Sequence, residues 1–251
     1  MELSISNIDI FKKVFESIKE LDIVDTNFEF TKQGLKIENM DASHTSLVYL
    51  NLSKDFFESY TCNTDITVGL NIPVFCKILK ACRDTDSLGI TKNKNDNFLC
   101  LVVSNTDKNQ EFELPEMEID TDKLCIVDKY QYIINIASDV FNRIIHDISV
   151  VDGSNVRLTV QDNNILRWSI EGDLGKTSLE TKIENTKHGE STRQRLTNSF
   201  SINFMKKFIK SSNLGQDKSI TLSMENDIPI KLSSDLGNQS EIKFYIAPKI
   251  D

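Results

Sequence analysis

Two short clusters of basic residues are the groups in this sequence best suited to bind a ligand. The members are Lys77, Lys80 and Arg83 in the first cluster and Lys206, Lys207 and Lys210 in the second. Each cluster falls in a segment expected to be a short helix, Pro73–Arg83 and Ile202–Ser211, and neither segment holds an acidic residue. The two clusters carry +6 in a chain whose net charge is −9, so the remainder carries −15. Positive charge gathered on two helices of an acidic protein is typical of nucleic-acid binding.

The alternative is that these lysines form only the solvated face of amphipathic helices. In the first segment, Phe75, Leu79 and Cys82 occupy the other side, with Val74, Ile78 and Ala81 beside them. That pattern is common in helices that bind nothing. The repetition of the basic cluster in a second helix favours a binding role.

Length and composition predict a globular intracellular protein. A chain of 251 residues with 39% hydrophobic residues can bury one large core or two smaller ones. No apolar run approaches the roughly 20 residues that span a bilayer, and the first residues, Met1–Ser4, do not resemble a secretion signal. The odd number of cysteines and their spacing favour buried thiols in a reducing compartment. They are Cys62, Cys76, Cys82, Cys100 and Cys125.

The second half of the chain repeats the first at a shift of 130 residues. Phe11 corresponds to Phe141, Lys13 to Arg143, and the apolar character of Leu35 to that of Ile165. A constant offset over helices and strands indicates an internal duplication. Each half is expected to run strand, helix, three strands, helix, three strands. Two helices beside a mainly antiparallel sheet give an α+β fold.

An acidic segment separates the halves, and we expect it to be a surface linker. It runs from residue 111 to 128 and contains the apolar stretch Leu124–Val127, which is unusual unless it covers or binds something. Two candidate edge strands, residues 111–113 and 178–183, could pair with another copy. Head-to-tail pairing of unlike edges makes a ring when the rotation closes.

The sequence gives no support for an enzyme. Gly172–Thr177 superficially resembles a phosphate-binding loop, but Ile170 stands where that motif needs glycine, so a turn between two strands is favoured. The three histidines lie far apart with no cysteine or carboxylate at ligand spacing. We therefore expect no catalytic residue, metal or cofactor. A monomeric module that grips one side of a duplex stays open as an alternative.

Three motifs resemble the DNA sliding clamps of the proliferating cell nuclear antigen (PCNA) family. They are Leu35–Val48 with its Met-Asp-Ala-Ser-His core, the helix with Lys77-Ile78-Leu79-Lys80, and the ending Tyr245–Asp251. The resemblance runs from the first expected helix to the last residue. It implies a clamp fold with two similar domains, 1–116 and 129–251, joined by a connecting loop, 117–128.

The resemblance further implies a homotrimeric ring of pseudo-sixfold symmetry whose helices line a hole that holds duplex DNA without reading its sequence. The residues that match or adjoin the basic pore positions are Lys12, Lys13, Lys19, Lys77, Lys80, Arg83, Arg143, His146, Lys206, Lys207 and Lys210. Phosphate contacts from lysines can be exchanged between registers, which suits sliding.

Partner proteins are expected to dock a short peptide in a pocket under the connecting loop. Its implied lining is Met40, His44, Leu47, Leu124, Ile126, Tyr130, Pro229, Tyr245, Ala247 and Pro248. The implied subunit interface consists of Phe112 and Thr177, Ser178, Leu179, Glu180 and Thr181. The expected partners are a DNA polymerase and other replication and repair proteins, an ATP-dependent clamp loader, and further copies of the chain. The expected location is the nucleus, or a viral replication compartment.

Three positions depart from the family pattern. His146 replaces a customary arginine, Val127 replaces a customary linker proline, and Gln161 falls where a lysine is commonly modified by ubiquitin. These departures reduce the expected positive charge of the pore, loosen the loop and place ubiquitin signalling in doubt. A competing assignment is a subunit of a heteromeric clamp.

Overall fold

The protein folds into two compact units, which are described separately. The computed structural model describes residues 1–6, 8–120, 129–161, 165–183, 187–188 and 196–249. Unit 1 is made of residues 1–44, 48–124 and 235–242. Unit 2 is made of residues 45–47, 125–234 and 243–251. The domain boundaries expected from the sequence stay a prediction.

In the first half of the chain, the described residues form two α-helices and nine strands. In order they are β1 (Glu2–Ile5), α1 (Ile8–Lys19), β2 (Asp25–Thr31), β3 (Gly34–Met40), β4 (Ser46–Ser53), β5 (Ser59–Thr61), β6 (Ile66–Asn71), α2 (Ile72–Ala81), β7 (Ser87–Thr91), β8 (Phe98–Ser104) and β9 (Asn109–Pro115). A 3₁₀ turn, η1 (Lys54–Phe56), follows β4.

The second half repeats this order. Its elements are β10 (Tyr132–Ala137), α3 (Ser138–Ile148), η2 (Ser149–Val151), β11 (Asn155–Gln161), β12 (Ile165–Gly172), β13 (Gly175–Lys182), β14 (Lys187–His188), β15 (Leu196–Ser201), α4 (Ile202–Ser212), β16 (Ser219–Met224), β17 (Ile230–Gly237) and β18 (Ser240–Ile246). Strand β11 covers the residues of β2 shifted by 130, and β15 covers those of β6 shifted by 130. The predicted duplication is therefore confirmed at the level of secondary structure.

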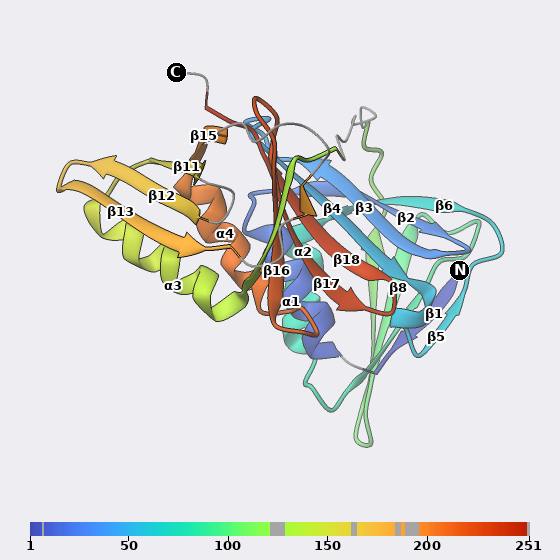
Figure 1. Ribbon diagram of the computed structural model, residues 1–251. Coiled ribbons are helices and arrows are strands. Elements are labelled where there is room, and N and C mark those ends of the chain that lie inside the picture. The colour runs from blue at the N-terminus through green and yellow to red at the C-terminus, as the bar shows by residue number, and fades with distance from the viewer. Residues whose placement is uncertain (7, 121–128, 162–164, 184–186, 189–195, 250–251) are drawn as a thin grey trace. The chain divides into compact units, whose positions relative to one another are not determined.

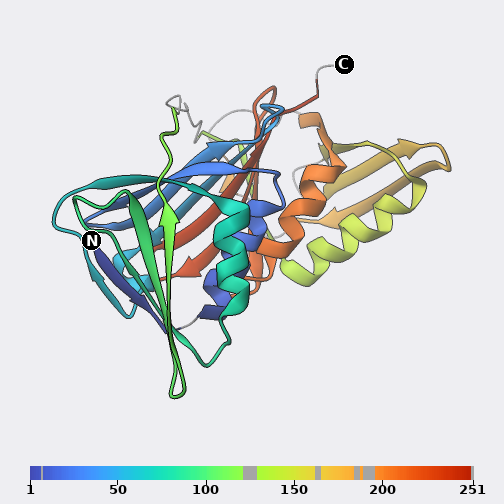
Figure 2. The same ribbon diagram turned by 180° about the vertical axis from the view of Figure 1, so that it is seen from behind.

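The strand order is duplicated as well. The first half has two runs of hydrogen-bonded neighbours, β5-β1-β7-β8-β9 and β4-β3-β2-β6. The second half has the corresponding runs β14-β10-β16-β17-β18 and β13-β12-β11-β15. The pairings described within these groups are antiparallel. Figures 1 and 2 show two helices side by side in each half, α1 with α2 and α3 with α4. The predicted α+β architecture is confirmed.

Two expectations about the strands are wrong. Five strands, not three, lie between the two helices of each half. The additional strands include β5 and β14, which are three and two residues long and too short to show a period of two. In addition, residues 111–115 belong to β9 and not to a linker. In β9, the alternation of apolar residues typical of a strand is limited to Phe112 and Leu114, because the residues on the other side of the strand are exposed and charged.

Aromatic packing positions the helices of unit 1. Phe15 of α1 stacks on Phe28 of β2 with ring centroids 5.4 Å apart, and Phe75 of α2 lies edge-on to both rings at 4.8 and 5.2 Å. All three side chains are fully buried. Such aromatic pairs add to the free energy gained by burying their area. This cluster fixes α1 and α2 to each other and leaves their opposite faces to solvent.

Unit 2 holds its helices with a different set of aromatic rings. Phe141 of α3 lies edge-on to Trp168 at 6.3 Å and to Phe208 of α4 at 6.0 Å. Phe208 in turn contacts Phe244 at 5.0 Å. The position equivalent to Phe15 is the aliphatic Ile145, which is also fully buried. The same helix pair is therefore built on a different core.

Helix α2 begins where the sequence predicts. Asn71 ends β6 and caps the helix, because its side-chain oxygen accepts a hydrogen bond from the amide of Val74 at 3.0 Å. Pro73 lies in the first turn, where its missing N–H leaves no donor unpaired. Of the apolar residues that we expect on the buried side of α2, Phe75 and Leu79 are buried, whereas Val74 is 44% exposed.

The cysteines are partly as expected. Cys62, Cys76 and Cys82 are buried free thiols, and Cys100 is half-buried. Burial raises the pKa of Cys76 to about 11, which keeps this thiol protonated and unreactive at neutral pH. Cys125 lies outside the described residues. Within the described part of the chain, no helix has the length and apolar character needed to cross a membrane.

Candidate nucleic-acid interface and peptide pocket

The basic residues of unit 1 lie on the solvent side of α1 and α2 or just after α2. Lys13, Lys77, Lys80 and Arg83 are exposed, while Lys12 and Lys19 are half-buried. The structure therefore brings five of the six predicted residues of this unit onto two neighbouring helices and places Arg83 two residues after the end of α2. Their availability to a ligand differs from residue to residue.

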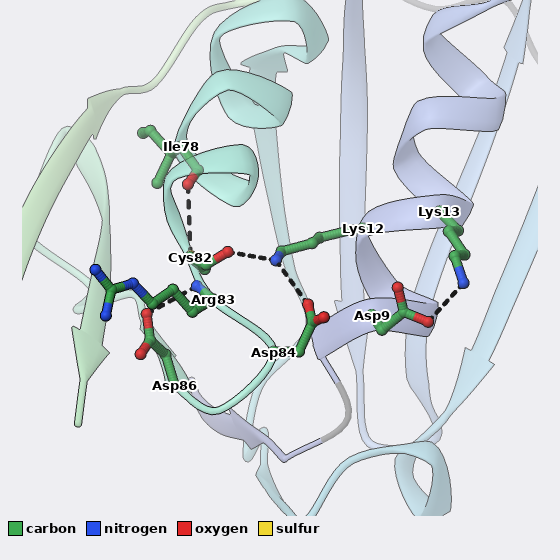
Figure 3. Close-up of polar contacts among 8 residues, drawn as sticks. All are labelled: Asp9, Lys12, Lys13, Ile78, Cys82, Arg83, Asp84 and Asp86. Carbon is green, nitrogen blue, oxygen red and sulfur yellow. Dashed lines mark hydrogen bonds and ion pairs between the residues drawn. The ribbon is translucent and has the colours of Figure 1, made fainter. Parts of the chain in front are cut away.

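Lys12 is committed to a contact inside the protein (Figure 3). Its Nζ donates a short hydrogen bond to the carbonyl of Cys82, the residue that caps the C-terminus of α2. It also lies 3.2 Å from Oδ1 of Asp84, and its side chain is only 16% exposed. A cation is favourable at a helix C-terminus, where carbonyl groups lack partners. Lys12 therefore ties α1 to the end of α2 and is less available to DNA than its sequence position suggests.

Two further lysines of unit 1 have acidic partners at the surface. Lys13 Nζ lies 2.6 Å from Asp9 Oδ2 one turn earlier in α1, as Figure 3 shows. Lys80 Nζ lies 3.5 Å from Glu16 Oε1, which joins α2 to α1. Exposed pairs of this kind contribute at most about 1 kcal/mol, so a phosphate group can replace the carboxylate. The acids nevertheless reduce the local positive potential.

The turn after α2 holds Arg83 in place through its backbone. The amide of Arg83 donates to Asp86 Oδ2 at 2.8 Å, and Asn105 donates to the other oxygen of the same carboxylate at 2.8 Å. These two hydrogen bonds, the one from Asn105 first, lower the pKa of Asp86.

Unit 2 presents its basic residues in a different setting. Arg143, Lys206 and Lys210 are exposed, and Lys207 is half-buried with its Nζ 5.1 Å from the ring centre of Phe204. Helix α4 contains three lysines and no acidic residue. Over the residues that the structure describes, neither Arg143 nor Lys206 has an ion-pair partner. The strongest concentration of positive charge in this unit is thus on α4.

His146 adds little positive charge to α3. Its side chain is 83% exposed, and its Nδ1 lies 3.3 Å from the carboxylate of the next residue, Asp147. When the imidazole is protonated, this neighbour offsets its charge. Helix α3 therefore contributes mainly through Arg143.

The Met-Asp-Ala-Ser-His motif forms a tight turn in unit 1. Asp41 is buried, and one of its carboxylate oxygens accepts hydrogen bonds from both the amide, at 3.0 Å, and the hydroxyl of Ser43. The amide of His44 donates to the carbonyl of Asp41 at 2.9 Å, and His44 adopts a left-handed φ of 54°. This geometry leaves Met40 half-buried and His44 exposed. A residue that sequence reasoning missed, Asp41, thus holds two predicted pocket residues in place.

The other described pocket residues belong to unit 2. Leu47 and Tyr245 are largely buried, at 8% and 6% exposure, and the amide of Ala247 donates to the carbonyl of Thr45 at 2.8 Å. The hydroxyl of Tyr130 donates to the carbonyl of Pro229 at 3.2 Å, and Lys231 Nζ lies 4.8 Å from the centre of the Tyr130 ring. Pro248 is half-buried. Leu124 and Ile126 lie outside the described residues, and the pocket as a whole stays a prediction.

The two strands expected at the subunit interface are edge strands. β9, which contains Phe112, is the last strand of its order, and β13, which contains Thr177–Thr181, is the last of another. Along β13, Ser178 and Glu180 are exposed, whereas Thr181 accepts a hydrogen bond from Trp168 Nε1 at 3.2 Å. The subunit interface stays a prediction.

Gly172 pairs with Gly175 at the turn between β12 and β13. The expected turn between two strands at Gly172–Thr177 is therefore confirmed.

Among the acidic partners of the basic face, sequence reasoning missed Asp84. The partner of Asp84 is Lys12, 72 residues earlier, so no local pattern could have identified the pair. The pair of Lys13 with Asp9 is local, because Asp9 precedes Lys13 by four residues on one helix, and it follows from the sequence alone. In the described ranges, no group of three or more His, Cys, Asp or Glu residues is arranged to hold a metal ion.

Comparison with known proteins agrees with this arrangement. Residues 1–124 match the family described as "Proliferating cell nuclear antigen, N-terminal domain", and residues 126–249 match its C-terminal domain. The chain is also 32% identical over 262 residues to the proliferating cell nuclear antigen of Chaetomium thermophilum, covering 100% of this chain and 98% of that relative. Two matching domains and a relative aligned over its whole length identify the chain as a member of the proliferating cell nuclear antigen family of sliding clamps.

Proposed function

We propose that three copies of this chain form a closed ring that encircles duplex DNA and holds a polymerase to it. The observation that carries this proposal is the repeated pair of helices, α1 with α2 and α3 with α4, whose solvent sides bear the exposed basic residues. Family membership supports a processivity factor. The chain itself catalyses no reaction in this proposal.

DNA is held by charge and by topology. Lys77, Lys80 and Lys206 are exposed and can reach phosphate groups, and the contacts of such side chains carry no sequence information. Each contact can be exchanged for the next phosphate as the ring moves along the duplex. The excess negative charge elsewhere on the chain discourages DNA from binding outside the ring.

Ring closure uses the two unlike edge strands. β9 of one copy pairs with β13 of the next, and the backbone groups of both strands are available on their outer sides. Because the two edges differ, the contact is head-to-tail, and such contacts close into a ring when the rotation between copies divides a full turn. Three copies with two similar halves each give pseudo-sixfold symmetry.

Partner proteins dock a peptide in the pocket predicted from the turn at Met40–His44, the connecting loop and the chain end. The partly buried apolar side chains of Met40, Leu47 and Tyr245 suit hydrophobic anchors of such a peptide. The proposed partners are a DNA polymerase, other replication and repair proteins, and an ATP-dependent loader that opens the ring. The proposed location is the nucleus or a viral replication compartment.

The native mass over a dilution series tests the ring. The monomer is 28.6 kDa, so a trimer should have about three times that mass and keep it down to its dissociation range. Retention on closed circular DNA, with loss after the circle is cut, tests encirclement. A persistent monomer that binds linear fragments tightly and with a steep salt dependence would instead support the one-sided DNA-binding module. A monomer that trimerises only with another protein would support a heteromeric clamp.

A further inference from the structure

We infer that residues 116–119, here called the linker anchor, are fixed to the edge of β6, and that Gly69 is the residue that makes this attachment possible. The anchor lies directly after β9 and directly before the segment that carries Leu124 and Ile126. The consequence for peptide docking rests on the function proposed above. The attachment itself is argued from residues of unit 1 alone.

Backbone contacts pair the anchor with the outer edge of β6 through a single β-bridge. The amide of Met117 donates to the carbonyl of Gly69 at 2.9 Å, and the two residues form an isolated antiparallel bridge. Strand β6 pairs with β2 on one side and is the last strand of its order, so its other side can accept this bridge. Asn27 of β2 then donates its side-chain amide to the carbonyl of Ile119 at 3.0 Å.

An ion pair between a buried lysine and a partly exposed glutamate fixes the beginning of the anchor. Lys92 is only 5% exposed, and its Nζ lies 2.6 Å from Oε2 of Glu116. Lys92 also donates to the carbonyl of Asp96, and the amide of Glu116 donates to the carbonyl of Asn97 at 2.9 Å. A buried ammonium without its carboxylate is unfavourable, so Glu116 is held strongly. The anchor is therefore attached at Glu116, Met117 and Ile119 in succession.

Gly69 is required because the anchor lies against its α-carbon. A Cβ at this position would lie 2.2 Å from the carbonyl oxygen of Met117 and 2.9 Å from Cδ1 of Ile119. Both distances are shorter than real contacts, and the first involves backbone, which cannot rotate away. The backbone of Gly69 is not left-handed, so the requirement is for space and not for an unusual φ. Any side chain at residue 69 must displace the anchor.

This attachment determines where the connecting loop starts. Ile119 precedes Leu124 by five residues, so the anchor fixes the chain at a point shortly before two predicted pocket residues. Fixing a binding segment in advance lowers the conformational entropy lost on binding and raises affinity. Gly69 is thus a positioning residue for the peptide site, although it contacts no predicted pocket residue.

The test compares Gly69→Ala with Gly89→Ala. Gly89 lies in β7 of the same unit, and a Cβ there would meet nothing closer than Val102 Cβ at 3.9 Å, so it controls for the cost of alanine in a strand. We expect amide hydrogen exchange at Met117 to be about tenfold faster in Gly69→Ala and unchanged in Gly89→Ala. A labelled peptide, selected from a displayed library by its binding to the unsubstituted protein, should bind Gly69→Ala about three- to tenfold more weakly. Native mass should stay the same.

The outcomes separate this inference from the proposed function. If no library peptide binds the unsubstituted protein, the peptide-docking proposal fails while hydrogen exchange still tests the anchor. If Met117 exchanges at the same rate in both alanine variants, the anchor is wrong; if it exchanges faster but peptide affinity is unchanged, the positioning role is wrong. Should Gly69→Ala not fold, Asn27→Ala removes only the bond to Ile119 among the anchor contacts described and must give a smaller change in the same direction.

Discussion

The basic faces of the two units differ in how much of their charge is committed to the protein itself. In unit 1, Lys12, Lys13 and Lys80 each have a carboxylate partner within 3.5 Å. In unit 2, α4 carries three lysines without an acidic residue, and Lys206 has no ion-pair partner among the described residues. We therefore expect matching positions of the duplicated fold to contribute unequally to DNA binding. We expect α4 to contribute most, because this helix holds three lysines and no acidic residue.

The largest expected effect comes from neutralising α4. Replacing Lys206, Lys207 and Lys210 by Gln should lower affinity for a short duplex about tenfold or more, because three potential phosphate contacts are lost. The salt dependence of binding should become less steep for the same reason. The matched variant replaces Lys12, Lys13 and Lys80 by Gln and should lower affinity only a few-fold, because these lysines are already paired with carboxylates in the unsubstituted protein and are less available to phosphate. Fluorescence anisotropy at several salt concentrations measures both slopes. Equal losses in the two triple variants would show that the ion pairs of unit 1 do not limit its contribution.

A second comparison separates structural from binding lysines on one helix. Lys12→Met should destabilise the protein by about 1–2 kcal/mol, because the carbonyl of Cys82 loses a charged partner in a half-buried setting. Lys13→Met should change the free energy of unfolding by less than about 0.5 kcal/mol, because its pair with Asp9 is exposed. Urea unfolding measures this. We expect the reverse order for DNA affinity, and a Lys12→Met variant with unchanged stability would contradict the assigned tether.

Removing an acid from unit 1 should make that unit more like unit 2. Glu16→Gln eliminates the carboxylate 3.5 Å from Lys80 and should raise duplex affinity about twofold at low salt. Stability should change little, because this pair is exposed. Glu171→Gln, which breaks the exposed pair with Lys176 in the β12–β13 hairpin, is a control for the loss of one negative charge elsewhere. An equal gain in both variants would point to net charge and not to the local pair.

Much of this fold could be predicted from the sequence, because local patterns carry it. The capped start of α2 at Asn71, the period-two strands around the turn at Gly172–Gly175, and the shift of 130 residues all depend on neighbours in the chain. The very short β5 and β14 could not, since two or three residues show no period. Residues 111–113 could be identified as a candidate edge strand, but the start of the linker could not be placed, because the exposed charges of β9 resemble those of a surface linker.

The candidate site was less predictable than the fold. Its basic residues could be assigned by type and by family resemblance, but their partners lie far away in sequence, as with Lys12 and Cys82, 70 residues apart. The role of Gly69 is likewise invisible in the strand pattern, because it depends on Met117 approaching its α-carbon. Contacts between distant segments decide which matching residues remain available to a ligand.

The smallest expected effect concerns the departure on α3. His146→Arg replaces a side chain that is charged only when protonated by one that is always charged. Duplex affinity should rise less than about twofold at neutral pH, because Asp147 lies beside this position and offsets part of the added charge. The double variant with Asp147→Asn should gain more than the sum of the two single changes if that neighbour is the limit. A gain from His146→Arg as large as the loss from neutralising α4 would overturn the ranking of the helices, since it would show that unit 2 depends on α3 as much as on α4.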